Sequence, residues 1–263
     1  MKTLIIFVLA ILAMTHQTNA KSTHSLNFAA ENSVEQKVDL RNIQDSIMSA
    51  FMSSFVDQNN SKITTLIEEL AASYESSNNS LLLYWKGYAL YYNSIIYLKS
   101  ADRKNAEIEL KKGIEALESI KKKNSEDYAL LSMLQSFSCQ FARFPAVVKL
   151  SENAAVNINR AIEIDGSNLR AHYISANNDY YTPENYGGGK NVEEYALKAI
   201  SLPAQKIVNP YLPSWGKQES YELLTNYYIR SKNTVKAKEY IAKGLKEFPN
   251  SYVLKTNQSK ISK

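Results

Sequence analysis

Apolar residues recur at helical spacing from about residue 33 almost to the end of the chain. In the first such stretch, Val38, Ile43, Ile47, Phe51 and Phe55 follow one another at steps of four or five, which places them along one side of a helix. No alternating apolar run is flanked by an Asn-Gly or Asp-Gly turn, so the pattern does not indicate a β-hairpin. The spacing predicts an all-α protein.

About ten helices are expected, separated by short polar or proline-containing stretches. Asn60-Ser61 is a candidate helix cap, Phe144-Pro145 is expected to end a helix, and prolines mark a connector over residues 203–213. The expected helices cover residues 38–55, 60–70, 80–100, 101–122, 125–143, 151–164, 167–181, 192–201, 217–231 and 234–247, and the last two complete the expected fold. The segment 80–100 is apolar nearly all round, which predicts burial between neighbouring helices.

The N-terminus has the pattern of a secretory signal peptide. Lys2 precedes an apolar run over residues 4–14, and polar residues then lead to the small residue Ala20. The run is shorter than the roughly 20 apolar residues that a membrane-spanning helix needs, although an uncleaved anchor is the alternative. We therefore predict a signal peptide over 1–20, a flexible tail over 21–32 and a helical domain over 33–258. The chain is expected to be exported, in the periplasm or outside the cell, with no transmembrane segment after cleavage.

The charge is modest and unevenly placed. The formal net charge is +5, with 25 Lys against 6 Arg. Nucleic-acid readout favours Arg, and an exported protein seldom meets nucleic acid, so we expect no nucleic-acid partner. Residues 31–80 carry eight acids and three bases, whereas residues 230–263 carry nine bases and two acids. The basic end is either a solvated lysine-rich face or a surface for an anionic partner.

Paired helices recur with a period typical of a repeat protein. The clearest unit consists of Tyr221, Leu224, Thr225, Tyr228, Ala237, Ile241, Gly244 and Pro249, at spacings of 3, 1, 3, 9, 4, 3 and 5. This unit resembles the tetratricopeptide repeat (TPR), in which small residues let two helices approach closely and large residues fill the space between pairs. A second unit places Leu90, Ser94, Tyr97, Ala106, Leu110 and Gly113 at the corresponding offsets. The resemblance implies a TPR-like α-α superhelix over about 80–250.

Two short loops carry a narrower resemblance. The segment 183–189 and the segment 213–216 are similar to loops of exported bacterial repeat proteins, among them the accessory subunit of TRAP-type transporters. In TPR proteins the first helix of each pair lines a concave surface. The resemblance therefore implies that such a surface presents Tyr88, Tyr91, Lys99, Arg170, Tyr173, Asn177, Tyr180, Glu222, Asn226 and Arg230.

Few residues in this sequence are of a kind that carries catalysis. Only three histidines and one cysteine occur, and no HExxH, CxxC, EF-hand or P-loop motif is present. His172 is expected to be a packed or surface imidazole and Cys139 a buried thiol, while the glycine run 187–189 is expected to form a tight turn. We predict no enzyme, no cofactor and no metal site. The alternative, an enzyme, would use His172, Asp179 and Glu184, although capping or turn formation explains the two acids.

Tyrosine is the most distinctive bias of the composition, with 18 residues. Tyrosine packs through its ring and stays hydrated at its hydroxyl, so the bias suits either a helical core or a binding groove. Our leading hypothesis is a non-catalytic exported scaffold that binds a protein or peptide in its concave groove. The alternative is a helical module that binds a small molecule or glycan, in which Tyr186 and Trp215 on the irregular loops act as stacking platforms.

Overall fold

The computed structural model describes residues 38–261, which fold into α-helices and contain no strand. The all-α prediction is confirmed. The predicted signal peptide (1–20), the predicted tail (21–32) and the first residues of the predicted domain lie outside the described part of the chain. The helices are α2 (Ile43–Asp57), α3 (Ser61–Ser77), α4 (Ser80–Lys99), α5 (Arg103–Glu118), α6 (Ser125–Ser138), α7 (Ala146–Ile164), α8 (Leu169–Tyr181), the 3-10 turn η1 (Glu184–Tyr186), α9 (Val192–Ser201), α10 (Lys217–Arg230), α11 (Thr234–Glu247) and α12 (Tyr252–Ile261).

Most expected helices are present, and four details differ from the expectation. Helix α6 ends at Ser138, before Phe144-Pro145, and α7 begins at Ala146 instead of Ser151. Helix α12 was not expected, because only Leu254 and Asn257 of this short polar helix are buried and Pro249 had marked an end. At the start of α3 the capping oxygen belongs to Asn59, whose Oδ1 accepts from the Ser61 N–H at 3.0 Å.

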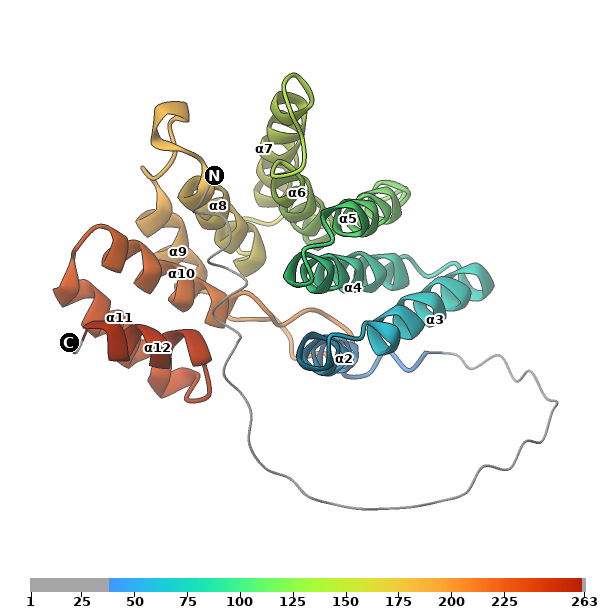
Figure 1. The fold of residues 1–263 in the computed structure, drawn as a ribbon, viewed down its shortest axis with the longest axis horizontal. Coiled ribbons are helices and arrows are strands. Elements are labelled where there is room, and N and C mark those ends of the chain that lie inside the picture. Colours follow the sequence, from blue (N-terminus) through green and yellow to red (C-terminus); the bar gives the residue numbers. More distant parts are fainter. Residues whose placement is uncertain (1–37, 262–263) are drawn as a thin grey trace, which may run out of the picture.

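The helices form two concentric layers that curve into an arc (Figure 1). Among the described residues, the even-numbered helices α2, α4, α6, α8, α10 and α12 each contact the next one in that series. The odd-numbered helices contact only even-numbered ones. The even-numbered helices therefore lie on the inside of the curve, and we call them the inner helices. This arrangement is the superhelical stack of antiparallel pairs that the sequence predicted.

Small residues allow the pairs to approach closely, as the repeat pattern predicted. A Cβ added to Gly113 of α5 would lie 2.8 Å from Leu134 Cδ2 of α6. One added to Gly244 of α11 would lie 2.7 Å from Leu254 Cδ1 of α12. Each distance is below van der Waals contact, so these glycines set the distance between helices. Thr225, a residue of the same repeat unit as Gly244, is fully buried in α10.

Residues 182–191, which we call the insertion, follow α8 and form a tight turn in which backbone packs on backbone, as the glycine run predicted. The Gly189 N–H donates to the Asp179 carbonyl at 2.9 Å, and the Asp179 carboxylate accepts from the Asn191 N–H at 2.7 Å. A Cβ on Gly188 would lie 1.9 Å from the Thr182 carbonyl oxygen. No side chain can be accommodated there without movement of the backbone.

Substitution of Gly188 should therefore loosen the insertion. We expect Gly188→Ala to cost about 1–3 kcal/mol of unfolding free energy through overpacking and to speed proteolysis within residues 182–191. Gly166→Ala is the control, since its new Cβ would meet only the Ile162 carbonyl, at an ordinary 3.7 Å. Equal proteolysis of the two variants would contradict the tight packing of this turn.

Candidate functional site

One edge of the inner helices is closed by the chain itself. The connector, residues 202–216, runs from the C-terminal half of the arc to α2 and back into α10 (Figure 1). Its Pro210 carbonyl accepts from the Asn42 N–H at 3.1 Å, and its Tyr211 carbonyl accepts from Trp85 Nε1 at 3.0 Å. The Gln44 side chain accepts from the N–H of Ser214 at 2.9 Å. The connector thus spans the N-terminal ends of the inner helices.

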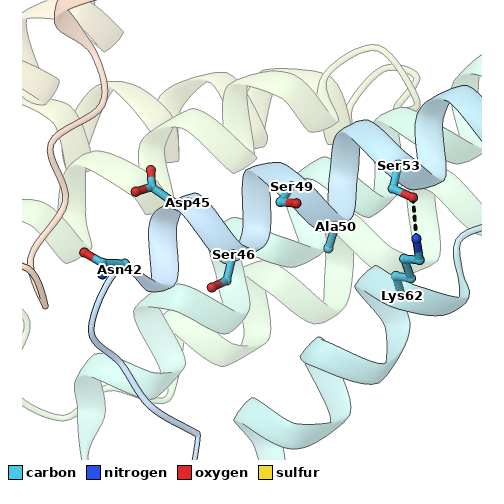
Figure 2. A pocket seen from close by; sticks show the side chains of 7 residues that line it. All are labelled: Asn42, Asp45, Ser46, Ser49, Ala50, Ser53 and Lys62. Atoms are coloured by element: carbon cyan, nitrogen blue, oxygen red, sulfur yellow. Dashed lines mark hydrogen bonds between the residues drawn. The ribbon is translucent and has the colours of Figure 1, made fainter. Parts of the chain in front are cut away.

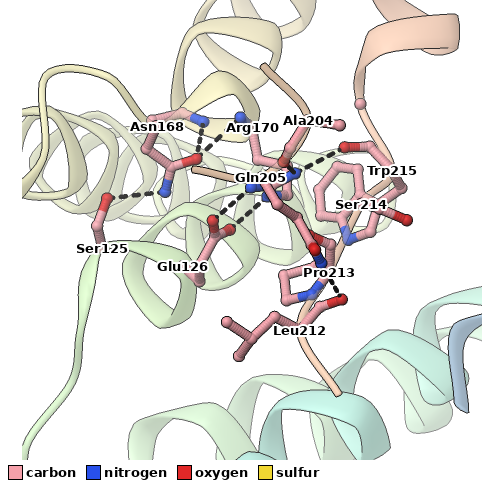
Figure 3. Close-up of polar contacts among 12 residues, drawn as sticks. Ser125, Glu126, Asn168, Arg170, Ala204, Gln205, Leu212, Pro213, Ser214 and Trp215 are labelled. Carbon is pink, nitrogen blue, oxygen red and sulfur yellow. Dashed lines mark hydrogen bonds and ion pairs between the residues drawn. The ribbon is translucent and has the colours of Figure 1, made fainter. Parts of the chain in front are cut away.

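Arg170 fastens the connector from the opposite side (Figure 3). Its guanidinium donates to the carbonyls of Ala204 and Trp215 at 2.9 and 3.0 Å, and it forms a two-pronged ion pair with Glu126 at 2.6 and 2.7 Å. Only 4% of Arg170 is exposed. Its charge is therefore used within the fold, and it does not lie on an open surface.

The Trp215 side chain packs against the inner helices at the edge that the connector covers. Its ring stacks on Tyr88 with centroids 5.5 Å apart and meets Tyr173 edge-on at 6.1 Å, and its Nε1 donates to the Tyr84 hydroxyl at 3.0 Å. Trp215, Tyr173 and Tyr88 are 6%, 6% and 1% exposed. The prediction that Tyr88, Tyr173, Arg170 and Trp215 lie on an open surface is corrected, because the connector covers that part of the inner face.

Beyond Trp215, partly buried aromatic side chains continue along the inner helices. The Tyr91 ring of α4 meets Phe137 of α6 edge-on at 5.1 Å and Tyr92 at 5.2 Å. Tyr181 at the end of α8 meets Tyr180 edge-on at 4.9 Å. We call Tyr91, Tyr92, Phe137 and Tyr181 the inner aromatic face. These rings keep part of their surface in solvent, unlike the fully buried Tyr84 and Trp85.

Side chains on α4 and α10, two helices on opposite sides of the arc, interact electrostatically across the inner aromatic face. Burial raises the pKa of Tyr91 and Tyr92, and the charge of Glu219 on α10 raises both further. Helices α4 and α10 do not pack against each other, so the arc brings their side chains together across its inside. Burial also raises the pKa of Glu219, whose carboxylate accepts from the Gly216 N–H at 2.7 Å. Glu219 of α10 and the two tyrosines of α4 are therefore close enough for a charge on one helix to act on the other.

Glu222 lies one turn further along α10. Burial, followed by the neighbouring charge of Glu219, raises the pKa of Glu222 to about 7. Its Oε1 accepts from Ser251 at 2.7 Å and from Gln218 at 2.9 Å. Ionisation of Glu222 is therefore unfavourable in the folded protein, and stability should fall as the pH rises from about 4.5, its ordinary pKa, towards 7.

Glu222→Gln should remove this pH dependence. Glutamine keeps an acceptor for Ser251 and Gln218 but cannot ionise, so we expect a gain on the order of 3 kcal/mol in unfolding free energy at pH 8 and little change at pH 4. Urea unfolding at both pH values measures the difference. Glu68→Gln is the control, because Glu68 is exposed on α3. It should leave the pH profile of stability the same as in the wild type. A gain of similar size at both pH values would contradict the proposed cause.

The opposite edge of the inner helices carries three cations stacked on aromatic rings. Lys99 lies 3.8 Å above the Phe55 centroid, Arg103 lies 5.0 Å from the Phe141 centroid and Arg230 lies 3.9 Å above Tyr180. They donate to the carbonyls of Phe55, Gln140 and Tyr180 respectively. Each cation connects the C-terminal end of an inner helix to a neighbouring element. None of the three forms an ion pair within residues 38–261. We call the side of the inner helices that carries Lys99, Arg103 and Arg230 the cationic edge.

The remaining residues predicted from sequence are distributed around this edge. Asn177 and Tyr180 are partly buried on α8, and Asn226 of α10 accepts from the Asn257 amide at 2.8 Å. Tyr186 is 79% exposed on the insertion, away from any ring contact in the described part of the chain. Of these residues, Tyr180 and Arg230 are in direct contact, whereas Tyr186 stands apart on the insertion.

The residues weighed for catalysis have structural contacts. His172 is 8% exposed, with Nε2 2.9 Å from the Gly166 carbonyl oxygen. Asp179 holds the insertion turn, and Glu184 is exposed in η1. Cys139 is partly buried, and burial raises its pKa, which disfavours a reactive thiolate. No group of three or more His, Cys, Asp or Glu within residues 38–261 is placed to hold a metal ion.

A shallow groove between α2 and α3 is the other candidate site (Figure 2). It has a volume of about 510 Å³ and is lined mainly by short polar side chains: Asn42, Asp45, Ser46, Ser49, Ala50, Ser53 and Lys62. Lys62 Nζ donates to Ser53 Oγ at 2.7 Å. The groove is wide open and has no aromatic side chain, so the inner aromatic face is the stronger candidate.

Comparison with known proteins supports the fold. The HusA haemophore from Porphyromonas gingivalis has a similar solved structure, with a TM-score of 0.51. The similarity covers 72% of this chain and 94% of that chain, at 22% sequence identity. No family model and no curated protein matches the sequence. At this identity the similarity shows a shared helical architecture. None of the helices in residues 38–261 is long and apolar enough to cross a membrane.

Proposed function

We propose that this chain is an exported, non-catalytic binding protein that holds a planar, largely apolar small molecule of the porphyrin class on its inner aromatic face. The observation that carries the proposal is the group of partly exposed rings, Tyr91, Tyr92, Phe137 and Tyr181, on the inside of the arc. The choice of ligand class is supported by a structural neighbour that is a haemophore. The stacked helix pairs supply the curved inner surface, and export is the expectation from the N-terminal pattern.

The residues present suit the macrocycle better than the iron of a haem. Aromatic rings stack on flat apolar ligands, and the gain grows when water is excluded. Iron ligation by tyrosine needs the phenolate, whereas burial raises the pKa of Tyr91, Tyr92 and Tyr181. His172 is buried next to Gly166. The face therefore favours recognition through the ring system, with ligand carboxylates directed towards the cationic edge at Arg230.

A titration of haem and of metal-free protoporphyrin IX, followed by absorbance, tests the proposal. We expect both to bind with similar affinity, because the contacts are to the macrocycle. Tyr91→Ser with Tyr181→Ser should weaken binding by about 30- to 150-fold, the effect of removing two stacking rings at about 1–1.5 kcal/mol each. Circular dichroism checks that the variant is folded.

Tyr186→Ser is the matched control, since Tyr186 is exposed on the insertion outside the inner face. It should bind like the wild type. If Tyr186→Ser lost binding while the double variant kept it, the ligand would lie on the insertion and the proposed site would be wrong. Failure of either porphyrin to bind the wild type would refute the proposed ligand class.

A peptide or protein partner is the second candidate, supported by the connector itself. Residues 210–216 cross the inner helices, and side chains such as Gln44 and Arg170 bind their backbone groups. This is how a helical groove holds an extended peptide of varied sequence. On this view an external peptide would contact the uncovered part of the same face, and it would compete with porphyrin.

A further inference from the structure

The connector exposes an apolar tip on the edge opposite the cationic one. Ile207 and Val208 are adjacent in sequence and 81% and 93% exposed, and Tyr211 and Leu212 behind them are 41% and 43% exposed. Single exposed apolar residues are ordinary, whereas four within six positions of one loop indicate a contact surface. We call Ile207, Val208, Tyr211 and Leu212 the connector tip.

The base of the tip is rigid, because one side chain holds it (Figure 3). Gln205 Nε2 donates to the carbonyls of Asn209, Leu212 and Pro213 at 3.0, 2.6 and 3.0 Å, and Gln205 Oε1 accepts from the Asn209 N–H at 2.8 Å. The contacts to α2, α4 and α8 described above hold the rest of the connector. The apolar side chains are therefore presented in a fixed position and cannot collapse onto the core.

The backbone of Tyr211 and Leu212, in the second half of the tip, is paired within the protein. In addition to the Gln205 contacts, Asn209 Oδ1 accepts from the Tyr211 N–H at 2.9 Å, and the Leu212 N–H donates to the Asn209 carbonyl at 3.2 Å. Burial of an unpaired backbone group in an apolar medium costs several kcal/mol. The paired groups of Tyr211 and Leu212 can enter the edge of a lipid layer without that cost. The backbone of Ile207 and Val208 has no hydrogen bond within residues 38–261, so only their side chains insert and their backbone stays among the hydrated headgroups.

Basic side chains flank the tip. Lys206 precedes Ile207 and is paired with Asp165 at 2.9 Å, and Arg41, whose pKa is raised by Asp39 and by the nearby Tyr211, is paired with Asp39 at 2.7 Å. Both cations are more than 60% exposed, so these ion pairs are weak and can be exchanged for phosphate headgroups. Lys206 and Arg41 are therefore the side chains that would contact the phosphates of an anionic surface.

From this combination we infer that the connector tip is a lipid-contact surface. It inserts Ile207 and Val208 into the interfacial region of an anionic membrane, with Tyr211 at headgroup level and Lys206 and Arg41 against phosphates. The inferred contact is peripheral, because it is made only by the side chains of this loop. The inference does not depend on the porphyrin ligand, since the inner aromatic face lies between this edge and the cationic one.

Sedimentation with unilamellar vesicles of phosphatidylglycerol and phosphatidylethanolamine, compared with pure phosphatidylcholine, tests the inference. Wild type and variants carry the same N-terminus. We expect binding to the anionic vesicles and a loss of at least about tenfold in the partition coefficient for Ile207→Ser with Val208→Ser. Val235→Ser is the control, because Val235 is a lone valine on α11 with a similar 79% exposure, and it should bind like the wild type.

A second readout keeps the test independent of the folding of the double variant. The emission of Val208→Trp should shift to shorter wavelength when anionic vesicles are added, whereas that of Val235→Trp should not. Equal vesicle binding by the wild type and the tip variant, or no shift for Val208→Trp, would overturn the inference. A tip variant that instead changes the molar mass in light scattering, with no effect on vesicles, would also overturn it and favour contact with a second copy.

Discussion

Arg170→Met should cost about 3–5 kcal/mol of unfolding free energy, the range observed when one partner of a buried ion pair is removed. The substitution keeps most of the side-chain volume but leaves Glu126 without its cation and the carbonyls of Ala204 and Trp215 without a donor. Because Arg170 ties α6 and α8 to the connector, the loss should appear as a single cooperative decrease in stability. Urea unfolding followed by circular dichroism measures it.

Arg160→Met is the matched control for this prediction. Arg160 also pairs with a glutamate, Glu163 at 3.0 Å, but the two side chains are 55% and 62% exposed. An exposed pair is worth less than about 1 kcal/mol. The double variant Glu126→Gln with Arg170→Met should recover part of the loss, since it removes the unpaired charge. If Arg170→Met were no more destabilising than Arg160→Met, the contacts of Arg170 would not be what holds the connector in place.

Trp215→Ala should have an effect of similar size, about 3–5 kcal/mol, because it empties the largest side-chain volume under the connector. The variant loses the stacking on Tyr88, the edge contact with Tyr173 and the hydrogen bond to the Tyr84 hydroxyl. We expect the connector to loosen, so that limited proteolysis cuts within residues 203–214 before the helices unfold. Thermal unfolding together with mapping of the first cleavage site measures both effects.

Trp215→Phe separates the ring from its hydrogen bond. Phenylalanine keeps the stacking but cannot donate to Tyr84, so the cost should fall to about 1–2 kcal/mol. Tyr186→Ala removes an aromatic ring that is 79% exposed and should change stability by less than about 0.5 kcal/mol. Unchanged resistance of the connector to proteolysis in Trp215→Ala would show that its polar contacts alone hold it.

The sequence predicts the helices well because their signals are local. The close of α7 and start of α8 at residues 165–168 is one example, where the Asn168 side chain accepts from the N–H groups of Arg170 and Ala171. The small residues Gly113 and Gly244 also lie where the repeat pattern placed them. Helix α12 was missed because only Leu254 and Asn257 of its ten residues are buried, too few to give a periodic signal.

The candidate site was less predictable because it depends on contacts between residues far apart in sequence. Prolines mark residues 203–213 as a connector, but nothing local shows that Ser214 returns to Gln44, 170 positions earlier. Helix α4 is apolar nearly all round, so periodicity does not distinguish Tyr88, which is buried, from Tyr91 and Tyr92, which line the inner face. Tyr91 was predicted for the site, whereas Tyr92, Phe137, Tyr181 and Glu219 were missed.

The most direct test of the account is the fluorine NMR spectrum of the protein labelled with 3-fluorotyrosine and titrated with protoporphyrin IX. Single Tyr→Phe variants assign the signals among the 18 tyrosines. We predict that the ring current of the porphyrin shifts the signals of Tyr91, Tyr92 and Tyr181, while those of Tyr186 and Tyr252 stay in place. Shifts confined to Tyr186 or Tyr252, or no shift at saturating ligand, would contradict a binding site on the inside of the arc.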